Sequence, residues 1–436
     1  MLTDPSRRSF LQASLGLAAA ASLAAPSLMA RPLRTNVRIL ILGAGAGGLS
    51  IASRLARQLE GASISLVGAR QNHYYQPGYT MIASGLWRPG KVVSQTQDWL
   101  PRGVDWINQD ALSLDPDAQQ VGLANGQLLS YDLLIVATGC QLNYQDLEGM
   151  SPELIGQHGI GSVYASPEAA AITSQMIDDY RDQGGRAIFT LTHTPLKCAG
   201  APIKMTFTTL SRLEATGQRQ RYQVDFFSPN DNRVFGVPFY NDFVLQRFAE
   251  QQVGMFHQHR LTGIDAPSKT AYFRTSDGST SSQSYDFIHV VPPMSAPDLI
   301  RQSPLAWQQG GMAGQWLEVD QYSLQHLRYP NVFGIGDVNG IPFGKTAASV
   351  KLQVPTVEQN ILAYLQQQEL PAKYNGYTSC PLITGIGKAM LAEFGYGAEL
   401  LPSFSFIDPK EESWAVWIMK EKMLQPAYYA MLRGHI

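Results

Sequence analysis

Hydrophobic and polar positions near the start of the chain follow the pattern of a strand, a turn and a helix. Residues 36–42 (NVRILIL) form a nearly continuous apolar run, which is typical of a strand buried in a parallel sheet. Residues 49–59 have the period of an amphipathic helix, and residues 62–67 form a second apolar strand. The pattern therefore predicts a strand–helix–strand unit of a parallel sheet.

The turn between this strand and this helix reads GAGAGG, the arrangement that binds the phosphates of a dinucleotide. Gly43 permits the tight turn, and Gly48 lets the helix pack closely on the strand. Gly45, with Ala46 and Gly47, lets the backbone approach a pyrophosphate at the N-terminus of the helix. The context of strand, turn, helix and strand makes this prediction specific.

One expected residue is missing from this motif. The second strand of such a unit usually ends in Asp or Glu, which binds the ribose of the adenosine. Here it ends in Leu66-Val67-Gly68-Ala69-Arg70, so the residue at this position has no side chain to offer. Water, backbone or a neighbour such as Arg70 has to replace it, or nucleotide affinity is lower.

Further strands extend the pattern. Residues 131–137 (YDLLIVA) and 331–336 (NVFGIG) are apolar, and the second of these runs delivers Asp337. A helix at 167–181 and a strand at 187–191 open a second α/β region. The turn after this strand reads THTPLKCAGAP, with a proline and no close pair of glycines, so a second nucleotide site is not expected.

The predicted fold class is α/β, with two Rossmann-like dinucleotide-binding domains and a C-terminal region. We expect the first domain to bind the nucleotide and the second to lack a nucleotide site. The predicted segments are a signal peptide at 1–31, the first domain at 32–165 and 298–365, the second at 166–297, and the C-terminal region at 366–436.

The N-terminus predicts export. Arg7 and Arg8 are followed by Phe10 and Leu11 and then by an apolar run, which is the twin-arginine pattern. This route carries folded proteins, and it predicts a periplasmic protein or one on the outer face of the inner membrane. No later segment approaches the length of about 18 apolar residues needed to span a bilayer.

Composition and charge give no indication of nucleic-acid binding or of a metal site. The net charge of −2, without basic or acidic blocks, does not indicate nucleic-acid binding. Only 16% of the residues are charged, which fits a membrane-docking face, a homo-oligomer interface or simply a large core. His257 and His259 lack a third ligand, so no metal site is predicted.

The chain has three cysteines, at positions 140, 198 and 380, too few for a disulfide scaffold. Cys198 follows Lys197 at a strand-to-helix turn, where a cation and a helix N-terminus both favour the thiolate. Cys380 is expected in a polar turn. Such a pair beside a flavin would form a sulfur relay. Cys140 is interpreted as a structural or free thiol.

Several segments together resemble a known family. The Ala-Thr-Gly after the strand at 131–137 and the Gly-Asp at Asp337 resemble two-dinucleotide-domain flavoproteins. The chain as a whole resembles sulfide:quinone oxidoreductases, most closely their mitochondrial-type (type II) branch, over nearly all of the mature sequence. The segments that carry this resemblance are KCAGAP (197–202), VVPPMSAPDL (290–299), LQHLRYPNVFGIGD (324–337), GKTAASV (344–350) and YTSCPLITG (377–385).

The resemblance implies a function. Sulfide would be oxidised at a Cys198–Cys380 disulfide, leaving a persulfide that is expected on Cys380, while Cys198 contacts a non-covalently bound FAD. The electrons would pass to a membrane quinone, and the sulfur would leave on an acceptor that the sequence does not identify. The resemblance also implies that Asp337 binds the ribityl chain. The other implied FAD contacts are Gln76, the backbone at Ala111, and Lys345, Thr346 and Ala347.

The C-terminal segment is rich in aromatic and apolar residues. Trp414, Trp417, Ile418 and Met423 could form the apolar face of a helix that docks on a membrane or packs on the protein. Phe394, Tyr428 and Tyr429 are candidates for lining a quinone site.

One alternative function is the flavin subunit of a flavocytochrome c sulfide dehydrogenase, although the loop HYYQPG has no cysteine for a covalent flavin link. The other is a non-catalytic flavin- or sulfur-binding protein.

Overall fold

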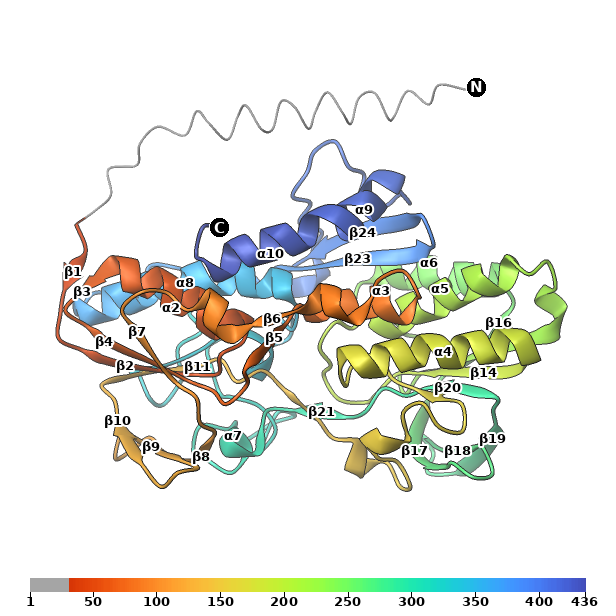
Figure 1. The fold of residues 1–436 in the computed structure, drawn as a ribbon, viewed down its shortest axis with the longest axis horizontal. Helices are drawn as coiled ribbons and strands as arrows, with labels where there is room; N and C mark the ends of the chain where they lie inside the picture. Colours follow the sequence, from red (N-terminus) through yellow and green to blue (C-terminus); the bar gives the residue numbers. More distant parts are fainter. Residues whose placement is uncertain (1–30) are drawn as a thin grey trace.

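The computed structural model describes residues 31–436, and its first sheet has five parallel strands in the order β22-β11-β2-β4-β7. Each central strand is an almost uninterrupted apolar run, because both faces of the sheet are covered. Strands far apart in the sequence meet in this sheet, since β22 pairs with β11 (Figure 1). The strands are β2 (Arg38–Leu42), β4 (Ser63–Val67), β7 (Val104–Ile107), β11 (Leu133–Val136) and β22 (Val332–Gly334).

Two long helices pack on each other beside this sheet. They are α2 (Ala46–Gln58), which follows the glycine-rich turn, and α8 (Ala347–Leu365). The guanidinium of Arg54 donates to the buried carboxylate of Glu358 at 2.7 Å and ties the two helices together. The segment that follows β22 is thereby held next to the glycine-rich turn.

The second sheet also has five parallel strands, in the order β13-β20-β14-β15-β16. The two sheets lie side by side in Figure 1. The strands are β13 (Ile160–Gly161), β14 (Gly185–Thr190), β15 (Tyr222–Phe227), β16 (Val253–Phe256) and β20 (Phe287–His289). The helices of this part are α4 (Pro167–Gln183), α5 (Ala201–Glu214) and α6 (Pro238–Glu250).

Smaller elements surround the two sheets. Two antiparallel sheets of three strands each are formed by β8 (Ala111–Asp115), β9 (Gln120–Leu123) and β10 (Leu128–Ser130), and by β17 (His259–Asp265), β18 (Thr270–Thr275) and β19 (Thr280–Ser284). The strand pairs are β1 (Leu33–Arg34) with β3 (Leu59–Glu60), β5 (Asn72–Tyr74) with β6 (Val93–Gln95), and β12 (Gln141–Leu142) with β21 (Met294–Ser295). Two short helices are α3 (Tyr79–Ala83) and α7 (Asp298–Arg301).

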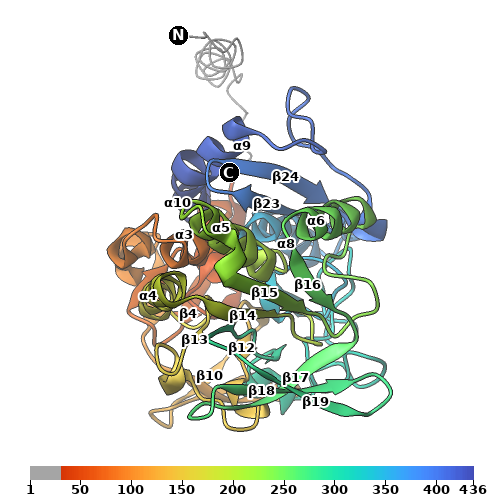
Figure 2. The same cartoon turned by 90° about the vertical axis from the view of Figure 1, so that its right-hand side faces the viewer.

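The C-terminal part is a hairpin followed by a bent helical segment. The antiparallel hairpin consists of β23 (Thr378–Gly385) and β24 (Lys388–Phe394), and β23 packs on α5 (Figure 2). The hairpin is followed in the sequence by α9 (Trp414–Ile418), a π-helical turn (Met419–Met423) and α10 (Leu424–Leu432), and α9 packs on β24. The chain therefore returns from the second sheet to pack α10 on α2 of the first.

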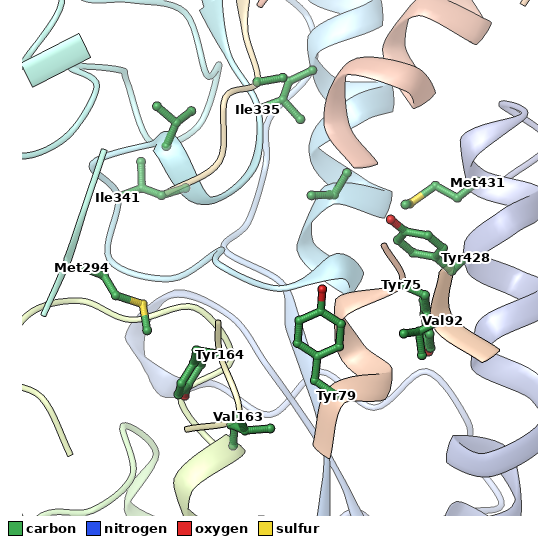
Figure 3. Close-up of a cluster of buried hydrophobic side chains, with 14 of the residues drawn as sticks. Tyr75, Tyr79, Val92, Val163, Tyr164, Met294, Ile335, Ile341, Tyr428 and Met431 are labelled. Atoms are coloured by element: carbon green, nitrogen blue, oxygen red, sulfur yellow. The ribbon is translucent and has the colours of Figure 1, made fainter. Parts of the chain in front are cut away.

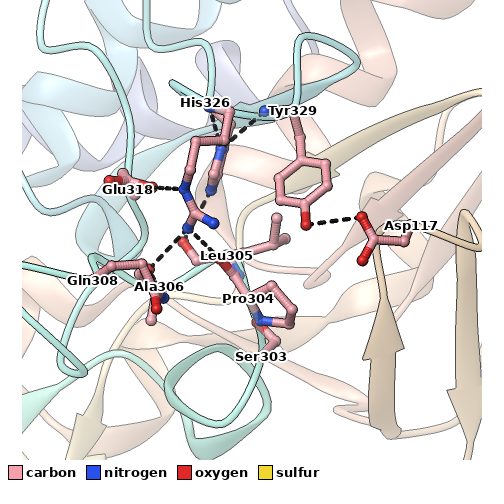
Figure 4. A network of polar contacts seen from close by, with 10 residues as sticks. Asp117, Ser303, Pro304, Leu305, Ala306, Gln308, Glu318, His326 and Tyr329 are labelled. Atoms are coloured by element: carbon pink, nitrogen blue, oxygen red, sulfur yellow. Dashed lines mark hydrogen bonds and ion pairs between the residues drawn. The ribbon is translucent and has the colours of Figure 1, made fainter.

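A polar network fixes the segment that leads into β22 (Figure 4). Arg328 donates to the carboxylate of Glu318 at 2.5 Å and to the backbone carbonyl of Pro304. The ring of His326 contacts the carbonyl oxygen of Leu305 at 3.1 Å. Tyr329 donates to Asp117 at 3.0 Å and connects this segment to the three-stranded sheet β8–β10. The network fixes the approach to β22, and so the position of Asp337 just beyond it.

The predicted α/β class is confirmed, and the strand and helix predicted around the glycine-rich turn are present. The predicted domain boundaries stay a prediction; in the structure the short strand β13 pairs with β20 of the second sheet. Among residues 31–436, no helix has the length and apolar character needed to cross a bilayer.

We predict that Gly48→Ala destabilises the protein. A Cβ at this position would lie 1.8 Å from the carbonyl oxygen of Gly43, and a backbone atom cannot move aside as a flexible side chain can. Forcing an extra methyl group into a packed site costs about 1–3 kcal/mol, which urea denaturation monitored by circular dichroism will measure. Gly90→Ala is the control, because a Cβ there meets nothing within 4 Å. Equal midpoints for the two variants would contradict the prediction.

Candidate flavin and sulfur site

The glycine-rich turn leaves an anion-binding space at the N-terminus of α2. Gly43 has φ +105°, and a Cβ there would lie 2.4 Å from the carbonyl oxygen of Ala137. A Cβ on Gly45, by contrast, would meet nothing within 4 Å. Gly45 is the N-cap of α2, no side chain caps the helix and its first turn has no acidic residue. The free amides and the positive end of the helix thus face open space, as a pyrophosphate requires.

Close packing against the glycine-rich turn explains why position 68 is a glycine. A Cβ there would lie 3.0 Å from the amide nitrogen and 3.1 Å from the Cβ of Ala44, within the glycine-rich turn. The carbonyl oxygen of Gly68 accepts a hydrogen bond from the indole of Trp106 at 3.0 Å. The usual acidic residue is therefore replaced by close packing of the turn on the end of β4.

Asp337 follows β22 in a short 3₁₀ turn, and Ile335 just before it packs on Gly47 of the glycine-rich turn. Among the described residues its carboxylate has no hydrogen-bond partner. Burial raises the pKa of this carboxyl, while the charges of Lys197 and Lys345 act in the opposite direction. A largely buried carboxylate without a partner is costly, and ligand hydroxyl groups would satisfy it. The residue fits the ribityl-binding position expected for it.

The segment from Lys345 to Ala347 begins α8. Thr346 is the N-cap, and its hydroxyl accepts from the amide of Ser349 at 3.1 Å, while Ala347 is the first helical residue. Lys345 is buried rather than exposed. Its ammonium donates to the carbonyl oxygens of Asp337 and Asn339, both at 2.7 Å, and burial lowers its pKa to about 8. Lys345 thus fixes the Asp337 turn against the start of α8.

Two further expected flavin contacts lie in the same half of the molecule. Gln76 is exposed, and its side-chain oxygen accepts from the ammonium of Lys197 at 2.8 Å. This bond links the loop after β5 to the segment that carries Cys198. Ala111 begins β8 and pairs with Leu123. The roles of these two residues in FAD binding stay predictions.

Cys198 and Cys380 meet at one ammonium group. Cys198 lies between β14 and α5, with φ +49°, and its amide donates to the carbonyl oxygen of Lys345 at 2.9 Å. Cys380 lies inside β23, so its prediction in a polar turn was wrong. The Nζ atom of Lys204, on α5, is 3.2 Å from the sulfur of Cys198 and 3.4 Å from that of Cys380. Both cysteines are free thiols in this structure.

The electrostatics of this cluster favour one thiolate, on Cys198. Hydrogen bonding by Cys380 lowers the pKa of Cys198 well below its ordinary value; burial opposes this, and Lys204 adds to it. The pKa of Cys380 is raised, first by Cys198 and then by burial. Burial alone would lower the pKa of Lys204, but the attraction of the two sulfurs outweighs it, and the net shift is upward. The cluster is therefore an ammonium–thiolate pair beside a neutral thiol.

Gly200 makes the meeting of the two sulfurs possible. A Cβ on this residue would lie 2.6 Å from the sulfur of Cys380. Sequence reasoning missed Gly200, Lys204 and a second buried lysine, Lys420. The available signal was weak: Lys204 stands six positions after Cys198, in the first turn of the helix that follows it.

Cys140 makes no bond to Lys204, unlike the other two cysteines, and is also a free thiol. Burial raises its pKa to about 11, so the neutral thiol is favoured. His257 and His259 do not share a strand face, because His257 precedes β17 and His259 begins it, with Gln258 turning between them at φ +58°. No group of three or more metal-ligating side chains occurs among the described residues.

Buried aromatic and apolar side chains from several elements gather in one cluster. Figure 3 shows Tyr164 and Met294 on one side and Tyr75, Tyr79 and Tyr428 on the other. The three residues proposed for a quinone site divide between two clusters. Tyr428 and Tyr429 contact the ring of Tyr75, whereas Phe394 contacts Phe235 and Phe343. Trp417 is buried, so it does not belong to an exposed apolar face.

Comparison with known proteins agrees with this arrangement. Residues 37–178 match the family model described as pyridine nucleotide-disulphide oxidoreductase. The chain is 36% identical to the mitochondrial sulfide:quinone oxidoreductase of Mus musculus, over 92% of this chain and 88% of that protein. It is 35% identical to the protein of the same name from Dictyostelium discoideum, over 93% and 88%.

The chain belongs to the sulfide:quinone oxidoreductase family. The X-ray structure of the sulfide:quinone oxidoreductase from Aquifex aeolicus has the same fold, with a TM-score of 0.75, 19% identity and 92% coverage of both chains. As a sulfide:quinone oxidoreductase the protein is a flavoprotein, and the glycine-rich turn and Asp337 fit that cofactor. Residues 4–24, outside the described part of the chain, match a twin-arginine signal sequence, which confirms the predicted export.

We predict that Gly45→Ala lowers flavin content without destabilising the fold. A methyl group here meets no protein atom but occupies the space left for the pyrophosphate. The variant, expressed and purified as the wild type, is expected to lose most of its flavin absorbance per protein, while the flavin-stripped variant and flavin-stripped wild type melt at the same temperature. Full flavin content in the variant would contradict this assignment.

We predict that Lys204→Met raises the pKa of Cys198. Loss of a cation close to a thiolate shifts its pKa upward by about 1–3 units. Alkylation of the reduced protein by iodoacetamide, followed across pH by mass spectrometry of the Cys198 peptide, is expected to need a correspondingly higher pH. Lys388→Met is the control, because Lys388 is exposed at the tip of the β23–β24 hairpin. An unchanged pH profile in Lys204→Met would refute the ammonium–thiolate pair.

Proposed function

We propose that this protein catalyses the FAD-dependent oxidation of sulfide to sulfane sulfur at the Cys198–Cys380 pair and passes the electrons to a membrane quinone. The observation that carries the proposal is the single buried ammonium of Lys204 within 3.4 Å of both sulfurs. Relatives named mitochondrial sulfide:quinone oxidoreductase at 35–36% identity support the same chemistry.

The chemistry at the sulfurs follows from their environment. In the oxidised enzyme the two cysteines form a disulfide. Sulfide attacks the sulfur of Cys380, the disulfide breaks, and a new sulfur–sulfur bond leaves a persulfide on Cys380. Cys198 departs as a thiolate, the form that Lys204 stabilises. The sulfane sulfur then leaves on an acceptor.

The chain's own residues bind and orient the flavin. The glycine-rich turn would hold the pyrophosphate, Asp337 would bind the ribityl hydroxyls, and the N-terminus of α8 at Thr346 and Ala347 would offer free amides to the pyrimidine edge of the ring. FAD held there would supply a two-electron acceptor next to the sulfur pair. We further propose that the flavin is not covalently attached, because the loop HYYQPG beside the site contains no cysteine.

The location proposed for the enzyme is the periplasm, at the outer face of the inner membrane. The twin-arginine signal supports export. Met423 on the C-terminal helical segment and Phe406 before it are about half exposed, and we propose these side chains for a peripheral membrane contact.

We predict that sulfide bleaches the flavin absorbance of the purified protein and that a short-chain quinone restores it. Cys380→Ser and Cys198→Ser are each expected to lose at least about 100-fold in the rate of bleaching, because a lone thiol cannot form the disulfide that sulfide attacks. NADH is expected to leave the spectrum unchanged. Acid precipitation is expected to release all of the FAD.

Three outcomes would contradict this function. Flavin that stays with the acid-precipitated protein would favour the flavocytochrome-type alternative. Absence of bleaching by sulfide in the wild type would leave a flavin-binding protein without this activity. Bleaching at wild-type rate in both cysteine variants would remove the sulfur pair from the mechanism.

A further inference from the structure

The start of α8 contacts both chain segments that carry the two sulfurs. The carbonyl oxygen of Lys345 accepts a hydrogen bond from the amide of Cys198 at 2.9 Å. The hydroxyl oxygen of the next residue, Thr346, lies 2.9 Å from the hydroxyl oxygen of Thr378, which begins β23 two positions before Cys380. Two consecutive residues at one helix start therefore hold the two segments, which are far apart in the sequence.

Thr378 and Cys380 lie on the same face of β23. Residues two positions apart on a strand point to the same side of the sheet, about 7 Å from each other along the strand. The sulfur of Cys380 lies against the start of α5, since a Cβ on Gly200 would be 2.6 Å from it. The strand packs on both α5 and α8. One face of β23 thus contacts α5 through Cys380 and α8 through Thr378.

The contact between the two threonine hydroxyls is buried and specific. Only 4% of Thr378 is exposed, and its bond to Thr346 is the one side-chain hydrogen bond that it makes within residues 31–436. The Thr346 hydroxyl is oriented in turn by Ser349, whose amide donates to it at 3.1 Å. Separation of β23 from α8 would leave a buried hydroxyl without a partner, which is unfavourable. The bond therefore ties the strand to the helix start.

This tie affects the sulfur pair because the hairpin is a small unit. The strands β23 and β24 form a sheet of only two strands, which is marginally stable by itself, so its position depends on its contacts with the helices. A disulfide forms only when the fold brings both sulfurs within bonding reach. A strand held in place before the bond forms raises the effective concentration of one thiol for the other.

We propose that Thr378 is a positioning residue for the sulfur pair: through the hydroxyl of Thr346 it holds Cys380 close to Cys198, so that their disulfide is favoured over two thiols. This inference rests on the proposed function. It concerns the exchange of the pair with a disulfide in solution, and the step balances. Two S–H bonds of the protein are lost and one S–S bond forms, while oxidised glutathione takes up the two electrons and two protons and gives two thiols.

The test measures the equilibrium between disulfide and dithiol in the holoenzyme. The protein is equilibrated without oxygen in mixtures of reduced and oxidised glutathione, free thiols are trapped with N-ethylmaleimide, and mass spectrometry gives the fraction with a Cys198–Cys380 disulfide. The main variant is Thr378→Val, which keeps the shape of the side chain and removes the hydroxyl. Thr378→Ala is a second variant without the hydroxyl, and Thr378→Ser restores it. The flavin content of each variant verifies that it is folded.

The same strand offers a matched control. Thr384 is also buried in β23, and its hydroxyl has no hydrogen-bond partner among the residues that the structure describes. Thr384→Val therefore makes the same chemical change in the same hairpin without removing a bond. A general loss of hairpin stability would affect both variants, whereas loss of the tie to α8 affects only Thr378→Val.

The ratio of disulfide to dithiol at a fixed glutathione mixture is expected to fall about 3- to 10-fold in Thr378→Val, as for the loss of one hydrogen bond. Thr378→Ala is expected to fall at least as far, Thr378→Ser to recover most of the ratio, and Thr384→Val to match the wild type. An unchanged ratio in Thr378→Val, or an equal fall in Thr384→Val, would overturn the inference and leave the proposed function intact. A wild-type pair that stays reduced in every mixture would count against the proposed function instead.

Discussion

The contact between the Lys204 ammonium and the two sulfurs is the interaction around which the site is organised. A lysine buried this deeply remains charged only if an anion lies beside it, and a thiolate in the same apolar surroundings needs a cation. Each therefore keeps the other ionised. Since Lys204 lies on α5 and Cys380 on β23, the pairing requires that these two elements pack directly on each other, as they do.

Small residues and backbone contacts allow this approach. Gly200 leaves room for the Cys380 sulfur at the start of α5. Cys198 adopts a left-handed backbone conformation that few residues other than glycine favour. Two hydrogen bonds hold it there: the Cys198 amide donates to the Lys345 carbonyl, and the Tyr164 hydroxyl donates to the Cys198 carbonyl. The same Lys345 fixes the turn that presents Asp337. The sulfur pair and the flavin-binding carboxylate are thus positioned through a shared residue.

Features that depend on local sequence could be predicted, and those that depend on long-range packing could not. The glycine-rich turn, the strand before it and Asp337 follow from neighbouring residues, since the turn, the apolar run and the helix start are all encoded within about 20 positions. Lys204 resembles an ordinary helix lysine in the sequence, because no neighbouring residue reveals that it will face two sulfurs.

The error at Cys380 has a similar cause. The polar residues and Pro381 around it indicate a turn, yet a two-stranded hairpin has free edges that tolerate a proline, and Pro381 simply pairs with Leu391 in the antiparallel register. The burial of Lys345 likewise depends on distant parts of the chain, because two backbone carbonyls and the face of Trp316 hold its side chain inside the fold.

The C-terminal segment joins the two halves of the site, and this bears on how the two reactions are coupled. Lys420 reaches the Pro77 carbonyl, and the hydroxyl of Tyr428 meets the ring of His73 at 2.7 Å. Further along, the Leu432 carbonyl accepts from Ser53 on α2. One segment therefore contacts the helix that starts at the glycine-rich turn and also the loop after β5, which is bonded through Gln76 to Lys197 beside Cys198. A displacement of this segment would disturb α2 and the loop after β5 together, so its position is a physical link between the glycine-rich turn and the segment that carries Cys198.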